Sequence, residues 1–140
     1  MSSGGRVLGV DPGRSKAGYA LLEADGTVLT AGIEPIERLF ESLRLVLAGG
    51  RTEVIALGRG TNSKAIRSSL EPLQVPIALV DEFETTRAAR TLYFDEHPPR
   101  GWRRLVPRGL LLPERPIDDY AAILIGRRFL AREAAARSPS

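Results

Sequence analysis

Asp11 has the residue type and the position that most strongly indicate chemistry in this chain of 140 residues. It follows the apolar run 7–10 and precedes the turn Pro12-Gly13, so a buried strand would end in a carboxylate. In α/β proteins this arrangement presents an acidic ligand at the carboxyl edge of a sheet, although aspartate also favours turns for purely local reasons. Two further acidic spots, around residues 82 and 118, strengthen the functional interpretation.

A second candidate for chemistry is the segment 97–112, which contains no acidic residue. Its basic and aromatic side chains include Arg100, Trp102, Arg103, Arg104 and Arg108. On a backbone rich in glycine and proline, these side chains predict a loop that binds phosphates and stacks on an unpaired base. Trp102 could instead be packed in the core. We expect His97, the single histidine, to be a surface residue rather than a catalyst.

Five strands and four helices are predicted to position these residues. Apolar runs predict strands at 6–10, 17–23, 28–33, 54–57 and 76–80, and helical spacing predicts helices at 36–47, 61–70, 85–94 and from 117 onward. An antiparallel meander that leads into parallel strands predicts an α/β fold, with a five-stranded mixed sheet flanked by helices. With 43% apolar residues, residues 1–140 can bury one core and form a single domain. Residues 1–5 and 131–140 are expected to be flexible.

Short motifs in this order resemble a known group of proteins. The sequence LGVDPG at 8–13, followed by GYA at 18–20, resembles the opening of the RuvC Holliday junction resolvases. The residues at 80–89 and at 118–122 resemble the later motifs of the YqgF (RuvX) family, the bacterial relatives of RuvC. This resemblance spans 6–129 and implies a ribonuclease H-like fold.

The resemblance also implies a nuclease with two divalent ions, Mg²⁺ or Mn²⁺, held by carboxylates from three separate elements. Asp11 would bridge the two ions, and Glu82 and Asp118 would each complete the coordination of one ion. The chemistry agrees, because phosphodiester hydrolysis uses one ion to generate hydroxide and another, roughly 3.5–4 Å away, to stabilise the leaving oxygen. Magnesium prefers oxygen ligands and keeps several waters, so a few carboxylates suffice. A helix N-terminus would stabilise the carboxylate form of Asp118.

Acidic neighbours leave the second ligand open. If the strand continues, Asp81 and Glu82 point to opposite faces of the sheet, so only one of them can face the ions. The family pattern favours Glu82. The arginine that usually follows this glutamate is Phe83 here, and Glu84 adds another acid.

The third ligand has one competitor. Asp118 shares a helical face with the apolar residues at 121, 122, 125 and 129, which turns its carboxylate toward the sheet. Asp119 shares a face that is nearly as apolar, but as a plain N-cap residue it would need no other role.

The segment 58–63 departs from the YqgF pattern, which has Gly-Leu-Pro after this strand. It resembles the glycine-threonine loop in the YqgF-like domain of the Tex transcription factors. A glycine loop that opens a helix offers N–H groups to an anion, and Arg59 and Thr61 lie within it, although an ordinary helix cap is the alternative. Arg14 and Lys16, which follow Asp11, could contact the scissile phosphate or could simply form a polar turn.

The composition favours an acidic polymer as the partner. Only Lys16 and Lys64 among the 20 basic residues are lysine, and the net charge is +3. Arginine binds phosphate through a planar fork, although a genome rich in arginine codons would explain part of this bias. The absence of cysteine excludes disulfides and thiolate metal sites, and no apolar run approaches the roughly 20 residues that cross a bilayer. We therefore expect a cytoplasmic protein with no membrane partner, and leave a homodimer open.

The sequence thus predicts a metal-dependent endonuclease that acts on structured nucleic acid. The YqgF resemblance indicates processing of ribosomal RNA precursors, and the RuvC-like opening indicates branched DNA. The sequence does not decide between RNA and DNA. A catalytically silent nucleic-acid-binding module, as the Tex-like loop suggests, is the alternative, but the acids at 11, 82 and 118 argue against it. A sugar or acetate kinase-like ATPase would need a second half and adenosine-binding loops.

Overall fold

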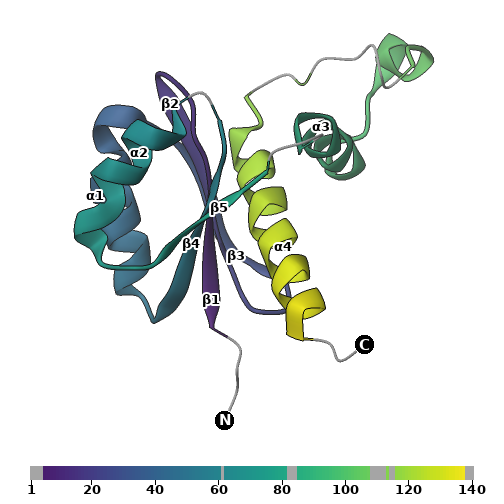
Figure 1. Ribbon diagram of the computed structural model, residues 1–140. Helices are drawn as coiled ribbons and strands as arrows, with labels where there is room; N and C mark the ends of the chain where they lie inside the picture. Colours follow the sequence, from purple (N-terminus) through teal and green to yellow (C-terminus); the bar gives the residue numbers. More distant parts are fainter. Residues whose placement is uncertain (1–4, 61, 82–84, 108–112, 114–115, 138–140) are drawn as a thin grey trace.

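The computed structural model describes residues 5–60, 62–81, 85–107, 113 and 116–137. Five strands form one mixed sheet in the order β3-β2-β1-β4-β5 (Figure 1). The strands are β1 (Arg6–Asp11), β2 (Lys16–Leu22), β3 (Val28–Pro35), β4 (Thr52–Gly58) and β5 (Ile77–Val80). The first three form an antiparallel meander, and β4 and β5 continue the sheet parallel to β1. The predicted five-stranded mixed sheet is therefore confirmed.

Helices cover both faces of this sheet. On one face lie α1 (Ile36–Ala48) and α2 (Ser63–Leu70), and on the other lies α4 (Asp118–Arg137), against which α3 (Thr85–Glu96) packs (Figure 1). Two short 3₁₀ helices, η1 (Glu71–Leu73) and η2 (Gly101–Leu105), follow α2 and α3. No helix within the described residues is long and apolar enough to cross a membrane.

The alternation of side chains along β1 divides the core into two layers. Leu8 and Val10 pack toward α1 and α2, whereas Val7 packs toward α4. Because side chains alternate, Asp11 at the end of β1 belongs to the same face as Val7 and Gly9, the face that α4 covers. The fold thus directs the carboxylate of Asp11 to the α4 side of the sheet.

Helix α4 approaches β1 and β2 closely because glycines face it. A Cβ atom on Gly9 would overlap the carbonyl oxygen of Ala122, and one on Gly18 would overlap the carbonyl oxygen of Asp118. Any larger residue at either position would push the helix away from the sheet. The first turn of α4 therefore lies directly on the backbone of β2.

The last helix extends into the segment that was expected to be flexible. It begins at Asp118, next to the predicted start at 117, and is continuous to Arg137. The reason is the run of alanines near its end, since alanine has the highest intrinsic helix propensity.

Candidate active site

Asp11 and Asp118 come from distant parts of the chain and meet around Gly18. Asp11 lies opposite Gly18 in the antiparallel ladder between β1 and β2. On the α4 face, the backbone of Gly18 lies directly against the backbone of Asp118. The strand end and the helix start that carry two of the three predicted ligands are thus brought to one edge of the sheet.

The carboxylate of Asp118 is in a partly desolvated position. Burial raises the pKa of Asp118, the ammonium group of Lys16 counteracts this, and the neighbouring Asp119 raises the pKa further. Burial disfavours the charged form of a carboxyl group, and positive charge nearby favours it. Lys16 supplies part of this charge and begins β2 on the same face as Gly18, since the two residues are two positions apart in the strand.

The environment of Asp119 differs from the one expected. The first helical hydrogen bond of α4 runs from the N–H of Ala121 to the carbonyl of Ile117, so Ile117 occupies the N-cap position. Asp119 lies in the first turn, where its Oδ1 accepts a hydrogen bond from the N–H of Tyr120 at 3.0 Å. The interpretation of Asp119 as the N-cap residue is therefore wrong.

Of the three acidic residues after β5, the structure describes only Asp81. Strand β5 ends at Val80, as the sequence predicted, so it does not continue through Asp81. Asp81 is exposed, and its Oδ1 lies 3.6 Å from Nε of Arg59. The predicted ligand Glu82 and the alternative Glu84 lie outside the described residues. Within the described part of the chain, no group of three or more acidic or histidine side chains is placed to hold a metal ion.

Several backbone N–H groups of the glycine loop after β4 already donate to protein carbonyls. The N–H of Arg59 donates to the carbonyl of Val80 at 2.9 Å, and that of Gly60 donates to Gly58 at 2.9 Å. The N–H of Ser63 donates to Gly60 at 3.2 Å. Phosphate binding by this loop would therefore rest on the exposed side chain of Arg59 more than on these N–H groups. Thr61, the other residue predicted to bind here, lies outside the described residues.

The turn after Asp11 presents positive charge at the same edge. Arg14 and Lys16 are both exposed, and both lie between β1 and the body of β2. The structure thus brings Arg14, Lys16 and Arg59 to the edge at which Asp11 and Asp118 meet.

The described part of the arginine-rich segment, residues 97–107, lies elsewhere. It contains η2, which Figure 1 shows beyond α3 and away from the sheet, so it is not placed against Asp11. Trp102 is 72% exposed, which rules out the alternative that it packs in the core. Arg100 and Arg104 are also exposed and Arg103 is partly buried, while Arg108 lies outside the described residues.

His97, the residue that precedes this segment, is exposed, as expected. Its ring stacks on the ring of Tyr93, with 4.7 Å between the ring centroids.

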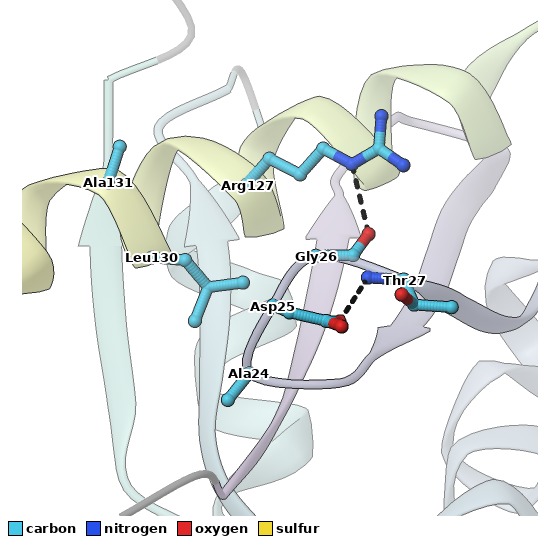
Figure 2. A pocket seen from close by; sticks show the side chains of 7 residues that line it. All are labelled: Ala24, Asp25, Gly26, Thr27, Arg127, Leu130 and Ala131. Atoms are coloured by element: carbon cyan, nitrogen blue, oxygen red, sulfur yellow. Dashed lines mark hydrogen bonds between the residues drawn. The ribbon is translucent and has the colours of Figure 1, made fainter.

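The opposite end of the sheet contains an open hollow of about 430 Å³, between the β2–β3 turn and α4. Figure 2 shows that polar groups here serve the turn itself: Oδ1 of Asp25 accepts the N–H of Thr27, and Nε of Arg127 donates to the carbonyl of Gly26. The hollow contains none of the predicted ligands, and it lies at the far end of β2 from Gly18. It is therefore separate from the candidate active site.

The chain is similar in sequence to one named relative and in structure to RuvC. No family model matches the chain. A protein of Novosphingobium aromaticivorans named "Putative pre-16S rRNA nuclease" is 29% identical over 140 aligned residues, which cover 89% of this chain and 84% of that protein. RuvC of Thermus thermophilus in complex with a Holliday junction substrate is similar in structure, with a TM-score of 0.56 and 16% identity over 95% of each chain. A second structure of RuvC from Thermus thermophilus has a TM-score of 0.55 and 17% identity, over 94% of this chain and 95% of that one. The chain has a ribonuclease H-like fold. The ribonuclease H-like fold that the motifs implied is thus confirmed, and the relative named as a pre-16S rRNA nuclease is consistent with their resemblance to the YqgF family.

One residue at the active edge of this ribonuclease H-like domain was not predicted to have a role there. Asn62 belongs to the segment 58–63, for which an ordinary helix cap was the alternative, yet its side-chain Nδ2 donates to the carbonyl of Gly13 at 2.9 Å. The local sequence gives no signal for this contact, because the two residues lie 49 positions apart.

Proposed function

We propose that this protein is a divalent-metal-dependent nuclease that hydrolyses phosphodiester bonds in structured nucleic acid. The observation that carries the proposal is the meeting of Asp11 and Asp118 around Gly18, at the sheet edge where three cationic side chains also lie. Support comes from the name of the Novosphingobium aromaticivorans relative and from the fold shared with RuvC.

The residues present fit Mg²⁺ or Mn²⁺. Carboxylate oxygens are the ligands that these hard cations prefer, and Asp11 and Asp118 would hold the ions together with Glu82. The partly buried position of Asp118 also suits a cation, because a positive charge would offset the desolvation of its carboxylate. When bound, two such ions would supply a hydroxide nucleophile and would stabilise the leaving oxygen.

The protein's own cations would hold the substrate. Lys16, beside Asp118, is the side chain best placed to contact the scissile phosphate, and Arg14 and Arg59 would bind adjacent phosphates. Arg100, Arg103 and Arg104 would bind the backbone at a distance from the cleaved bond, and exposed Trp102 would stack on an unpaired base. A substrate that reaches both groups of cations must extend from the sheet edge to η2, which favours a folded or branched polynucleotide.

Between the two substrate classes, we favour an RNA precursor. The relative named as a pre-16S rRNA nuclease is 29% identical to this chain, whereas the two RuvC structures are 16% and 17% identical. The nearer similarity in sequence is the better guide to substrate, because one fold supports many functions.

Cleavage assays would test the proposal. Purified protein would be incubated with end-labelled structured RNA from the 16S precursor and with a four-way DNA junction, in Mg²⁺, in Mn²⁺ and in EDTA. We expect metal-dependent cleavage of the RNA, lost in Asp11→Asn and retained in the matched variant Asp25→Asn, which alters an exposed aspartate at the other end of the sheet. Binding of both substrates without cleavage in either metal would instead indicate the silent binding module.

A further inference from the structure

Asn62 occupies a helix-capping position but does not cap its helix. It is the N-cap residue of α2, and its side chain makes no capping hydrogen bond. Asparagine is among the most favourable N-cap residues because its side-chain oxygen can accept an N–H of the first turn. Here the amide nitrogen donates instead to the carbonyl of Gly13, in a partly buried contact. The side chain therefore serves a tertiary contact and not the local stability of α2.

The partner of Asn62 belongs to the turn that carries the predicted metal ligand and two cations. Gly13 lies two residues after Asp11 and directly precedes Arg14. The turn is tight at this point, since a Cβ atom on Gly13 would overlap the carbonyl oxygen of Lys16. The far side of the turn is held by the N–H of Ile36, which donates to the carbonyl of Ser15 at 3.0 Å. Asn62 thus holds the side of the turn that is nearest to Asp11.

The same loop is also tied to the end of β5. The N–H of Arg59 donates to the carbonyl of Val80, and the side chain of Arg59 pairs with Asp81. Arg59 and Asn62 therefore link the turn that follows β1 to the end of β5.

We infer that Asn62 is a positioning residue of the metal site, acting through Gly13 on the orientation of Asp11 and of the cationic turn. This inference rests on the proposed nuclease function. Partners that orient metal ligands from outside the coordination sphere change metal affinity or activity by about 10- to 100-fold when removed. Asn62 should have an effect of this size, although it contacts neither substrate nor metal.

Two substitutions separate positioning from stability. Asn62→Ala removes the donor altogether. Asn62→Asp keeps the shape and caps a helix as well as asparagine does, but its carboxylate cannot donate to the carbonyl of Gly13. The matched control is Ser69→Ala, which removes another contact from side chain to backbone in α2, the 2.8 Å hydrogen bond to Ile66, away from the sheet edge.

Three measurements should be made on each variant: kcat and KM for cleavage, the melting temperature, and hydrogen–deuterium exchange of the metal-free protein over residues 12–17. We expect kcat to fall about 10- to 100-fold in both Asn62 variants with KM unchanged. Exchange at 12–17 should rise in both variants, and kcat should fall in both when it is measured well below the melting temperature. Ser69→Ala should match the wild type in kcat and in exchange at 12–17.

The possible failures are distinguishable. An inactive wild type would reject the proposed function, whereas the exchange of residues 12–17 would still report on the contact with Gly13. An active wild type with equally active Asn62 variants would reject positioning. Asn62→Asp could be fully active while Asn62→Ala loses kcat only in proportion to its lower melting temperature. That result would assign Asn62 a purely structural role. Unchanged exchange at 12–17 would likewise overturn the inference.

Discussion

The backbone of Gly18 lies directly against the backbone of Asp118, closer than any side chain at position 18 would permit. Asp11 is the ladder partner of the same glycine. The separation between the two predicted ligands is therefore set by a residue that has no side chain.

Replacing this glycine should displace the start of α4. In Gly18→Ala the added methyl group would overlap the backbone of Asp118, so the helix must move or the strand must bend. Overpacking of this kind costs about 1–3 kcal/mol of unfolding free energy, measured by urea denaturation, and should also lower nuclease activity. Gly49→Ala is the control, because its methyl group would be 3.6 Å from the nearest atom. Equal stability of both variants would show that the edge tolerates a wider spacing.

The raised pKa of Asp118 predicts that this residue costs stability at neutral pH. The native state then binds more protons than the unfolded state between the ordinary value of 3.8 and the raised pKa, so stability falls as the pH rises through that window. Without metal, Asp118→Asn should therefore melt at a higher temperature than the wild type at pH 7. The difference in melting temperature between Asp118→Asn and the wild type should disappear as the pH falls below 3.8.

Asp25 serves as a control, because its pKa is shifted in the opposite direction from that of Asp118. The N–H of Thr27 lowers the pKa of Asp25, so its carboxylate form is favoured in the native state. Asp25→Asn should lose stability at pH 7 and match the wild type only at low pH. If the stability of Asp25→Asn and of Asp118→Asn changed with pH in the same way, the burial of Asp118 and the hydrogen bond to Asp25 would not explain their pKa shifts.

Metal binding should stabilise the native protein. A ligand at ten times its dissociation constant adds about 1.4 kcal/mol, which for a domain of this size raises the melting temperature by roughly 3–6 °C. We expect this shift with Mg²⁺ or Mn²⁺ in the wild type and its loss in the double variant Asp11→Asn, Asp118→Asn. If no shift occurs at millimolar metal, either alone or with nucleic acid bound, the clustered site is not there.

The η2 segment should contribute to binding through two separable effects. Replacing Arg103 and Arg104 by alanine should weaken binding to all sequences and reduce the slope of log affinity against log salt by roughly 0.7–0.9 for each lost phosphate contact. Trp102→Ala should cost about 1–3 kcal/mol on substrates with unpaired bases and leave the salt slope unchanged.

Two controls accompany these binding measurements. Arg51→Ala removes a side chain that is 89% exposed and lies just before β4, at the other edge of the sheet, and it should leave the salt slope unaltered. Because Trp102 is exposed, its removal should not change the melting temperature. A fall of many degrees would mean that the tryptophan is packed against protein in solution.

The sequence by itself determined the elements and their order. The period of two in the strands and of 3.6 in the helices reflects which side of each element is buried, so it can be recognised without knowing the partner. The same holds for Asp11, because a strand that ends in a Pro-Gly turn must present its last residue at the sheet edge. For Asp118, the apolar face it shares with Ala122 and Ile125 indicated an inward direction, and both of those residues are fully buried.

Only the tertiary structure decided how the elements meet. The contact of Gly18 with Asp118 joins residues 100 positions apart, and that of Asn62 with Gly13 spans 49. Neither has a local signature, since a glycine in a strand or an asparagine before a helix is equally compatible with purely local roles. The exposure of Trp102 was undecided for the same reason, because burial of a large side chain depends on which surfaces the rest of the chain brings near it. Periodicity records the environment of a residue, whereas the identity of its partner is fixed only when distant segments pack together.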